Sequence, residues 1–370
     1  MKNFPSQIID PIYVPKEGYN VFEKVLLHFI NDRRDLPFAR LIAILHILVI
    51  VPAILLYLPI WSGWGWWVGA AIYFYISQFY FKGRFGLMLH CICHRKLFKK
   101  QYAFLHTYVI WVVCPFFGHT PESYFSHHIG MHHMENNMPD DDSSTMGYQR
   151  DSVRSFLRYY LDFLFLGFRD TILYLYYRKR RKMYVRLSWG ESAFFALCIG
   201  LSFVNLPATL VVFIVPFLFA RLVMMLGNWT QHAFVERSNP DNIYTNSIIC
   251  INTPYNKICW NDGYHTIHHL RPGMHYTDLP LEFIKQKDEL AMNKTFVFEG
   301  IHYLHIFIYL MTKRYDRLEK NLVNINNVFS SPQEAIALMK ERTKKFAIVQ
   351  EREVQVTGSI PTKKLAENLG

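Results

Sequence analysis

The sequence predicts an all-α, multi-pass membrane protein with two transmembrane hairpins and a cytosolic, histidine-rich helical cap. Hydrophobic residues make up 51% of the 370 residues and charged residues only 19%, against roughly 25% in an ordinary soluble domain. The apolar residues are gathered in long runs, and the chain carries a formal net charge of +11. Many of the 17 histidines fall in four short stretches. The apolar excess excludes a disordered chain, and the histidine stretches are the candidate functional site.

The first predicted hairpin is formed by residues 41–60 and 64–81. Residues 41–60 contain no formal charge, and a helix of this length, at about 1.5 Å per residue, crosses the roughly 30 Å hydrocarbon core of a bilayer. The second run begins with Trp64, Trp66 and Trp67, whose amphipathic rings favour the membrane–water interface. We therefore expect the turn between the two spans to lie at that interface.

The second predicted hairpin is formed by residues 189–205 and 207–226, with Asn205, Leu206 and Pro207 as its tight turn. Two further apolar runs cover residues 102–117 and 159–177. The first of these is short, and the second is interrupted by charged residues. We expect both to form interfacial or re-entrant helices, and the alternative is that they are two more full spans.

The distribution of Lys and Arg predicts which side of the membrane each loop faces. The turns at 61–65 and 205–208 contain neither residue, whereas basic residues flank the opposite ends of the spans. By the positive-inside rule, both termini and all four histidine stretches are cytosolic, in the inner membrane of a bacterium or the endoplasmic reticulum of a eukaryote. The basic run at 178–182 suits anionic lipid headgroups, so we expect no nucleic-acid partner.

The chain is expected to have three parts. Residues 1–40 form a cytosolic N-terminal segment, residues 41–290 the membrane domain, and residues 291–370 a set of cytosolic or interfacial C-terminal helices. The N-terminal residues stay polar up to about residue 36, so no cleavable signal peptide is visible. In the last part, Ser331, Pro332 and Glu334 form a capping box that predicts a helix extending to about Phe346.

The histidine stretches have the spacing of metal ligands. Residues four apart lie on one face of an α-helix, so two such imidazoles can reach one metal ion. In the second stretch, His128 and His132 are expected to share a face, with His133 directed to a neighbouring ion. The four stretches contribute His90 and His94; His128, His132 and His133; Asn228 and His232; and His265, His268 and His269.

These stretches contain nine matched histidines, which are too many for one metal ion. A zinc site needs three or four protein ligands. Neutral imidazole suits iron as well as zinc, and two octahedral ions can share nine imidazoles together with Asn228, water or a substrate oxygen. The sequence therefore predicts a dinuclear iron centre. A non-redox membrane protein that binds zinc is the alternative.

The complete pattern, HxxxH, HxxxHH, NxxxH and HxxHH between two transmembrane hairpins, resembles the membrane fatty acid desaturase superfamily over roughly residues 41–280. The most specific part begins at Gly263, continues through the sequence HHLRP and ends at Leu279 and Pro280. It is similar to the last histidine box of acyl-lipid and sphingolipid desaturases. The second box departs from the usual HxxHH, and its HxxxHH spacing is similar to that of membrane alkane monooxygenases.

The resemblance implies both the ligands and the reactants. A long fatty acyl chain would enter from the membrane and acquire a double bond, with dioxygen as co-substrate and two iron ions as cofactor. The alternative, favoured by the second box, is a di-iron hydroxylase or monooxygenase of alkyl or isoprenoid lipids. No flavin, iron–sulfur or fused cytochrome motif is visible, so we expect a separate ferredoxin- or cytochrome-type electron donor. The implied iron ligands are His90, His94, His128, His132, His133, His232, His265, His268 and His269, with Asn228 as a direct or water-mediated tenth.

Other polar residues near the boxes are candidates for orienting the ligand imidazoles, because a ligating histidine usually donates its second N–H to another group. For each of them, a surface or packing role is the alternative. The three aspartates at 140–142 are expected to form a solvated loop. The candidates are His119, His127, His275, Glu122, Glu135 and Asp262.

We predict that both termini face the cytosol and that the turns at 61–65 and 205–208 face the opposite side. An epitope tag after Gly370 should bind antibody in bacterial spheroplasts only after the membrane is permeabilised. A tag inserted in the turn at 205–208 is the matched control, and it should bind antibody without permeabilisation. Binding of antibody to the C-terminal tag in intact spheroplasts would contradict this topology.

Overall fold

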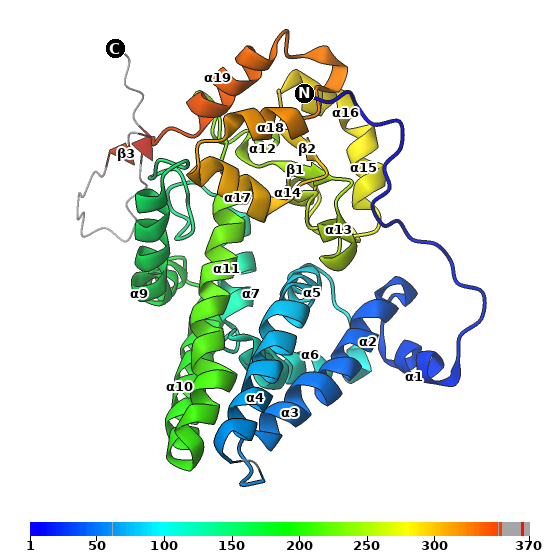
Figure 1. Ribbon diagram of the computed structural model, residues 1–370, viewed down its shortest axis with the longest axis vertical. Helices are drawn as coiled ribbons and strands as arrows, with labels where there is room; N and C mark the ends of the chain where they lie inside the picture. Colours follow the sequence, from blue (N-terminus) through cyan, green and yellow to red (C-terminus); the bar gives the residue numbers. More distant parts are fainter. Residues whose placement is uncertain (61, 347, 350–363, 366–370) are drawn as a thin grey trace. The chain divides into compact units, whose positions relative to one another are not determined.

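The computed structural model describes residues 1–60, 62–346, 348–349 and 364–365. It is mostly helical, although short β-strands are present where the sequence predicts an all-α fold, and Figure 1 shows the order of its elements. The chain forms two compact units: unit 1 contains Met1–Ile12, His127–Arg181 and Leu222–Gly370, and unit 2 contains Tyr13–Ser126 and Lys182–Arg221. Residue 61 of the first predicted turn and residues 350–363 and 366–370 of the predicted C-terminal part lie outside the described residues. The three-part division by sequence remains a prediction.

After α1 (Val21–Phe29), unit 2 contains two helical segments that correspond to the first predicted hairpin. The first segment consists of α2 (Leu36–Leu45), η2 (His46–Ile50) and α3 (Val51–Leu55), and the second of α4 (Gly63–Phe74), η3 (Tyr75–Phe81) and α5 (Lys82–His94). The Trp66 indole N–H donates to the Leu56 carbonyl at 2.9 Å. This bond joins the end of the first segment to the start of the second.

Three further helical segments correspond to the second predicted hairpin, and they lie in unit 2 up to Arg221 and in unit 1 from Leu222 on. They are α10 (Arg181–Thr209), η8 (Leu210–Ile214) and α11 (Val215–Gln231). The helix is broken at Asn205, which has φ −156° and ψ 97°, and whose side-chain oxygen accepts the Ala208 N–H at 3.0 Å. Beyond this break the chain reverses, since the rings of Phe194 and Phe217 stack with centroids 5.6 Å apart. The predicted turn at Asn205 is confirmed.

Two helices among the described residues are long and apolar enough to cross a membrane. They are Arg33–Leu55 and Arg181–Gln231, and the second contains the break at Asn205. Arg33–Leu55 overlaps the predicted span 41–60, and Arg181–Gln231 contains both predicted spans of the second hairpin. The predicted span 64–81 is not among the helices of the described residues that meet this criterion. The number of spans and their orientation remain predictions.

A short segment of unit 2 lies directly against α10. It follows α6 (Phe104–Tyr108), η5 (Val109–Val113) and η6 (Cys114–Phe117), which form the short apolar run of the sequence. Glu191 of α10 accepts a hydrogen bond from Thr120 and forms an ion pair with Arg221 at 3.2 Å. At Gly190, an added Cβ would lie 2.0 Å from the backbone oxygen of Pro121. Only glycine therefore allows this approach of the two backbones.

Unit 1 contains most of the other helices and a short parallel sheet of β1 (Ile249–Ile251) and β2 (Val297–Glu299). Its core packs Phe234, Phe296 and Phe298 against the C-terminal helices. The Glu334 N–H donates to the Ser331 hydroxyl at 3.2 Å, so the predicted N-cap of α19 is confirmed. The Glu334 carboxylate accepts the Ser330 N–H at 2.8 Å instead of closing a capping box on Ser331, and α19 ends at Arg342 rather than at Phe346 as predicted. The helices of unit 1 are η7 (His128–His132), α8 (His133–Glu135), α9 (Val153–Tyr177), α12 (Ile243–Asn246), α13 (Pro254–Ile258), α14 (His265–Leu270), α15 (Leu279–Lys285), α16 (Lys287–Met292), α17 (Tyr303–Met311), α18 (Tyr315–Asn321) and α19 (Pro332–Arg342).

The N-terminal residues also belong to unit 1. The Lys2 N–H donates to the Leu322 carbonyl at 2.7 Å, and the buried Asp10 carboxylate accepts the Tyr264 hydroxyl at 2.6 Å. Tyr264 is the residue immediately before α14. The N-terminal segment therefore supports the helix that carries the last histidine stretch.

We predict that Gly190→Ala lowers the thermal unfolding midpoint of the detergent-solubilised protein. The added methyl group meets a backbone oxygen that cannot rotate away, and overpacking of this kind typically costs about 1–3 kcal/mol. Gly200→Ala in the same helix is the matched control, because nothing lies within 4 Å of a Cβ there. Equal unfolding midpoints for the two variants would contradict the close packing at Gly190.

Candidate metal centre

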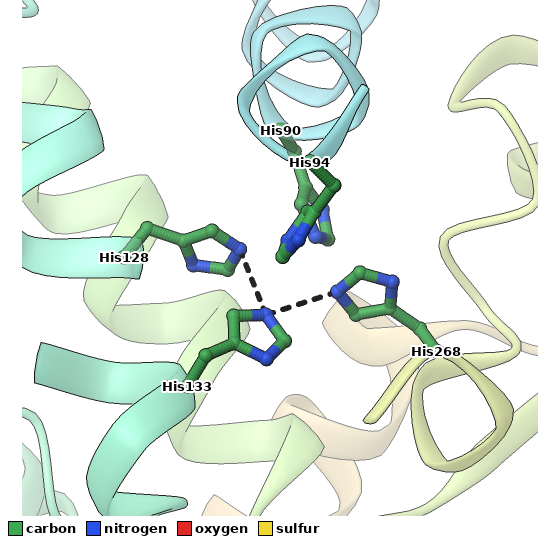
Figure 2. A group of neighbouring side chains, drawn as sticks. All are labelled: His90, His94, His128, His133 and His268. Carbon is green, nitrogen blue, oxygen red and sulfur yellow. Dashed lines mark hydrogen bonds between the residues drawn. The ribbon is translucent and has the colours of Figure 1, made fainter. Parts of the chain in front are cut away.

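Seven of the nine predicted histidine ligands lie in unit 1, where they form two groups. The first group contains His128, His133 and His268, and Figure 2 shows their rings converging. Within each group, the ligating nitrogen atoms lie within 4.8 Å of one another. The second group consists of His132, His232, His265 and His269, all of them buried.

The first group depends on a π-helical turn in the second histidine stretch. In η7 the His133 N–H bonds to the His128 carbonyl, five residues back. Residues five apart therefore lie on the same side of this turn, and the Nε2 atoms of His128 and His133 are 3.1 Å apart. The expectation that His128 and His132 share a face assumed an α-helix. Their ring centroids do lie 5.7 Å apart, but their ligating nitrogens belong to different groups, because this turn is π-helical. The wider turn directs His132 into the second group.

The second group is built mainly on α14. His265 and His269 are four residues apart on this α-helix, and their Nε2 atoms are 3.0 Å apart. His232, just beyond the end of α11, places its Nε2 3.3 Å from that of His265. His268 lies on another face of α14, with its Nε2 3.1 Å from that of His133 in the first group. One helix therefore supplies both groups.

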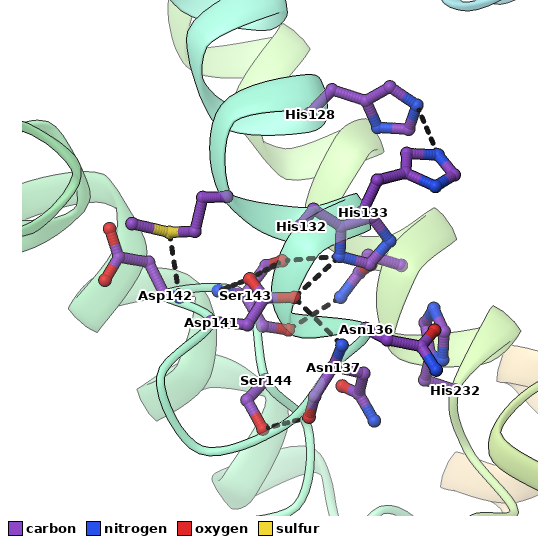
Figure 3. A network of polar contacts seen from close by, with 12 residues as sticks. His128, His132, His133, Asn136, Asn137, Asp141, Asp142, Ser143, Ser144 and His232 are labelled. Carbon is purple, nitrogen blue, oxygen red and sulfur yellow. Dashed lines mark hydrogen bonds and ion pairs between the residues drawn. The ribbon is translucent and has the colours of Figure 1, made fainter. Parts of the chain in front are cut away.

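Asp141 orients one imidazole of the second group. Its Oδ2 lies 2.7 Å from His132 Nδ1, and its Oδ1 accepts the Ser143 hydroxyl and N–H at 2.6 and 2.8 Å (Figure 3). Burial alone would raise the pKa of Asp141, but the contacts with His132, His127 and Ser143 outweigh it and hold the pKa below its usual range. A carboxylate accepts the Nδ1 proton, which leaves the Nε2 lone pair of His132 for a metal ion.

Asn246 orients His232 in the same way, by accepting the proton on Nδ1 of its ring. The Nδ1 atom of His232 lies 2.9 Å from the Asn246 backbone oxygen and 2.8 Å from its side-chain oxygen. Because a carbonyl oxygen only accepts, Nδ1 carries the proton and Nε2 carries the lone pair. Asn246 is itself held, since its side-chain nitrogen donates to the carbonyls of Asn136 and Pro240 at 3.0 and 2.9 Å.

The electrostatics of the second group favour neutral imidazoles. Burial, and then the neighbouring His132, lower the pKa of His232 to about 4. Burial and the surrounding histidines lower the pKa of His269 well below its ordinary value. Neutral imidazole is the form that binds metals, and buried ring nitrogens about 3 Å apart are stabilised by a shared cation. The donor set therefore fits a metal ion that prefers nitrogen ligands, such as iron or zinc.

Comparison with known families decides the affiliation of the chain. The model of the fatty acid desaturase family matches residues 66–299, which is more than half of the chain. The chain belongs to the fatty acid desaturase family. Neither the comparison with curated proteins nor the comparison with solved structures finds a match. The matched range includes every predicted metal ligand, from His90 to His269.

Membership of the desaturase family makes the chain a membrane-associated oxidoreductase. Two predicted ligands of this family, His90 and His94, lie in unit 2, at the end of α5. Their rings meet edge to face with centroids 5.5 Å apart, and Figure 2 shows both side chains leaving the same helix. Their role as ligands remains a prediction.

Asn228 lies near the end of α11 in this desaturase-family fold, with its side chain buried. Its side-chain nitrogen donates to the Ser143 carbonyl at 2.7 Å and lies 2.8 Å from the Tyr159 hydroxyl. These contacts fix the amide beside the Asp141 loop, because Ser143 also bonds to Asp141. Its role as a tenth ligand remains a prediction.

The six residues that the sequence offers as candidates for orienting the ligand imidazoles have varied surroundings. Glu122 accepts the Trp111 indole N–H at 3.1 Å, and Glu135 bonds to Tyr174 and Arg178. Three of the candidates lie beside other groups: His119 packs edge-on against Tyr124, Asp262 accepts the Tyr255 hydroxyl at 2.7 Å, and His275 Nδ1 lies 2.7 Å from the Thr277 hydroxyl. The Nε2 atom of His127 lies 3.9 Å from Asp141 Oδ1.

Sequence reasoning did not identify Asp141 and Asn246 as the residues that orient His132 and His232. Asp141 stands in a run of three aspartates that is typical of a solvated loop, yet its side chain is buried. Its distance of nine residues from His132 matches no helical or strand repeat. Asn246 acts partly through its backbone carbonyl, which leaves no signal in the sequence.

We predict that Asp141→Asn lowers metal affinity by about 10–100-fold while the protein stays folded. The asparagine amide can donate to His132 Nδ1, which would move the ring proton to Nε2 and block that ligand. Asp140→Asn is the matched control, since Asp140 pairs only loosely with the exposed Arg178 at 3.8 Å. Competition titration with a metal chelator measures the change. Wild-type affinity in Asp141→Asn would contradict the orienting role.

Proposed function

We propose that this protein is an oxygen-dependent di-iron membrane oxidoreductase that introduces a double bond into a long fatty acyl chain. The observation that carries this proposal is the convergence of seven histidines into two adjacent groups, both supplied by α14. One ion needs only one such group, so two groups favour two ions. The sequence HHLRP that begins at His268 in the last box favours desaturation.

The ligands divide between the two ions in this proposal. His132, His232, His265 and His269 hold one ion. His128, His133 and His268 hold the other. His90 and His94 of unit 2 are further ligands, by resemblance to the family. Asn228 is the tenth ligand, directly or through water.

The residues of the chain prepare the site for this chemistry. When bound, a pair of iron ions supplies the oxidising power, drawn from dioxygen, that removes hydrogen from an unactivated C–H bond. Asp141 and Asn246 keep the Nδ1 protons of His132 and His232 in place, which presents the Nε2 lone pairs inward. Burial of the second group excludes water that would compete with the substrate and divert the oxidant.

The membrane arrangement is part of the proposal. Two transmembrane hairpins would carry a cytosolic helical cap with both termini on the cytosolic side. Unit 2 contains a pocket of about 440 Å³ whose walls include Ile54, Val112, Phe116, Leu197 and Phe213. These apolar walls are compatible with a hydrocarbon chain that enters from the bilayer. Electrons would come from a separate ferredoxin- or cytochrome-type protein.

A second candidate function is hydroxylation of alkyl or isoprenoid chains. The observation that favours it is the HxxxHH spacing of the second box, which the π-helical turn η7 accommodates. Desaturation and hydroxylation can share the first hydrogen abstraction, and they differ in whether a second hydrogen leaves or oxygen is added to the carbon. Small shifts in the position of the substrate decide between the two outcomes.

We predict that expression in a host with simple lipids, under ¹⁸O-labelled dioxygen, yields acyl chains two mass units lighter and without label. The purified protein should contain close to two iron ions per chain. His268→Ala should lose both the product and iron, because it removes a ligand. His305→Ala is the control, since His305 lies in α17 outside both groups and bonds to the His302 N–H.

Two other results would contradict this function. A labelled hydroxy lipid as the dominant product would favour the hydroxylase. One zinc ion and no iron, in protein made with both metals available, would favour the zinc-binding alternative. Mass spectrometry of the lipids and metal analysis of the protein distinguish these outcomes.

A further inference from the structure

Arg150 is a fully buried charged side chain in unit 1, and the proposed reaction does not use it. Burial lowers the pKa of Arg150 to about 9, so the guanidinium remains charged at neutral pH. Burying a charge is costly unless hydrogen bonds replace the lost water. Here those bonds go to six backbone carbonyl oxygens, of Thr145 (3.2 Å), Met146 (3.4 Å), Tyr148 (3.1 Å), Ala233 (3.0 Å), Arg342 (2.8 Å) and Lys344 (2.8 Å).

The six carbonyls belong to three segments that are distant in sequence. Residues 145–148 follow the loop that contains Asp141. Ala233 is the residue immediately after the ligand candidate His232. Residues 342–344 lie at the end of α19, almost 200 residues after Arg150. One side chain therefore ties together the supports of two imidazoles and the C-terminal part of unit 1.

Arg150 thus joins residues 145–148, Ala233 and residues 342–344, and we call this meeting point the junction. Further backbone and side-chain contacts reinforce it. The Thr145 hydroxyl donates to the His232 carbonyl at 2.8 Å. The Arg150 N–H donates to the Thr343 carbonyl at 2.9 Å, and the Phe346 N–H donates to the Met146 carbonyl at 3.0 Å. The guanidinium also lies 5.2 Å from the centre of the Phe346 ring. We call residues 342–346 the C-terminal brace.

Both imidazoles that depend on this junction belong to the second group. His132 is oriented by Asp141, four residues before Thr145, and His232 is held through its own backbone. In the first group, His128, His133 and His268 of unit 1 are not sequence neighbours of the residues that supply the six carbonyls. Loss of the junction should therefore affect one metal position more than the other.

We propose that Arg150 is a positioning residue for the second histidine group and that the C-terminal brace completes this support. Arg150 holds the Asp141 loop against the residue that follows His232, so that His132 and His232 converge. Lysine cannot replace it, because a single ammonium group has three donors and cannot reach carbonyls on three sides. The inference rests on the proposed function, since it assumes that the second group binds a metal ion.

The test compares Arg150→Lys with the wild-type full-length protein in detergent, titrated with cobalt(II) after removal of bound metal. In a His268→Ala background the second group alone remains complete. There, Arg150→Lys should lower cobalt affinity by about 10–100-fold, the range expected for loss of an outer support. In a His269→Ala background, which leaves the first group complete, Arg150→Lys should leave cobalt affinity unchanged.

A matched control and a second variant keep the test decisive. Arg237→Lys is the control, because the Arg237 guanidinium lies 5.9 Å from the same Phe346 ring but is bonded to none of the six carbonyls. Phe346→Ala weakens the C-terminal brace without changing Arg150, and it should lower cobalt affinity only in the His268→Ala background. Circular dichroism verifies folding, and if Arg150→Lys does not fold, Phe346→Ala decides by the same criteria.

The outcomes separate this inference from the proposed function. Unchanged affinity in the His268→Ala background would overturn the positioning role, and so would an equal loss in both backgrounds. If either of these results is obtained and the wild-type protein still binds two cobalt ions, the di-iron function stands while the inference fails. If the wild-type protein binds no metal ion, both are overturned.

Discussion

The structure of unit 1 depends on one constraint: several imidazole rings must converge, buried, with their lone pairs directed inward. The facing Nε2 atoms lie 3.0–3.3 Å apart, and lone pairs at this distance repel unless a cation or a proton lies between them. Burial opposes the proton, as the low pKa values of His232 and His269 indicate. An arrangement that disfavours protons and concentrates lone pairs is suited to hold a metal ion. The surrounding contacts hold the rings in this otherwise unfavourable geometry.

Those contacts come from every part of unit 1. Asp141 directs His132 from a loop, Asn246 directs His232 from the end of α12, and Asp10 holds the hydroxyl of Tyr264 at the start of α14. Each outer group is buried and is itself hydrogen-bonded. A fixed outer contact matters because a ring free to rotate by a fraction of an ångström would not keep its nitrogen directed at a shared ion. The fatty acid desaturase domain is thus stabilised by residues from the N-terminal segment to α14.

Local helix geometry decides how the candidate ligands divide. An α-helical second stretch would place His128 and His132 together, whereas the π-helical turn η7 places His128 with His133 and directs His132 to the other group. The extra residue of the HxxxHH spacing is therefore accommodated without loss of a ligand. In α14 the ordinary α-helical repeat suffices, since His265 and His269 are four residues apart and His268 lies on another face.

The sequence by itself determined the features that depend on local patterns. Apolar runs predicted the long helices of unit 2, Asn205 with Pro207 predicted the break in α10, and Ser331 predicted the start of α19. The nine histidines were identified by their spacing, because metal binding requires particular residue types at helical intervals. Only the tertiary structure decided how they divide, since a π-turn depends on packing rather than on composition. It also decided the roles of Asp141, Asn246 and Arg150, because their partners are distant in sequence or are backbone atoms, which leave no pattern in the chain.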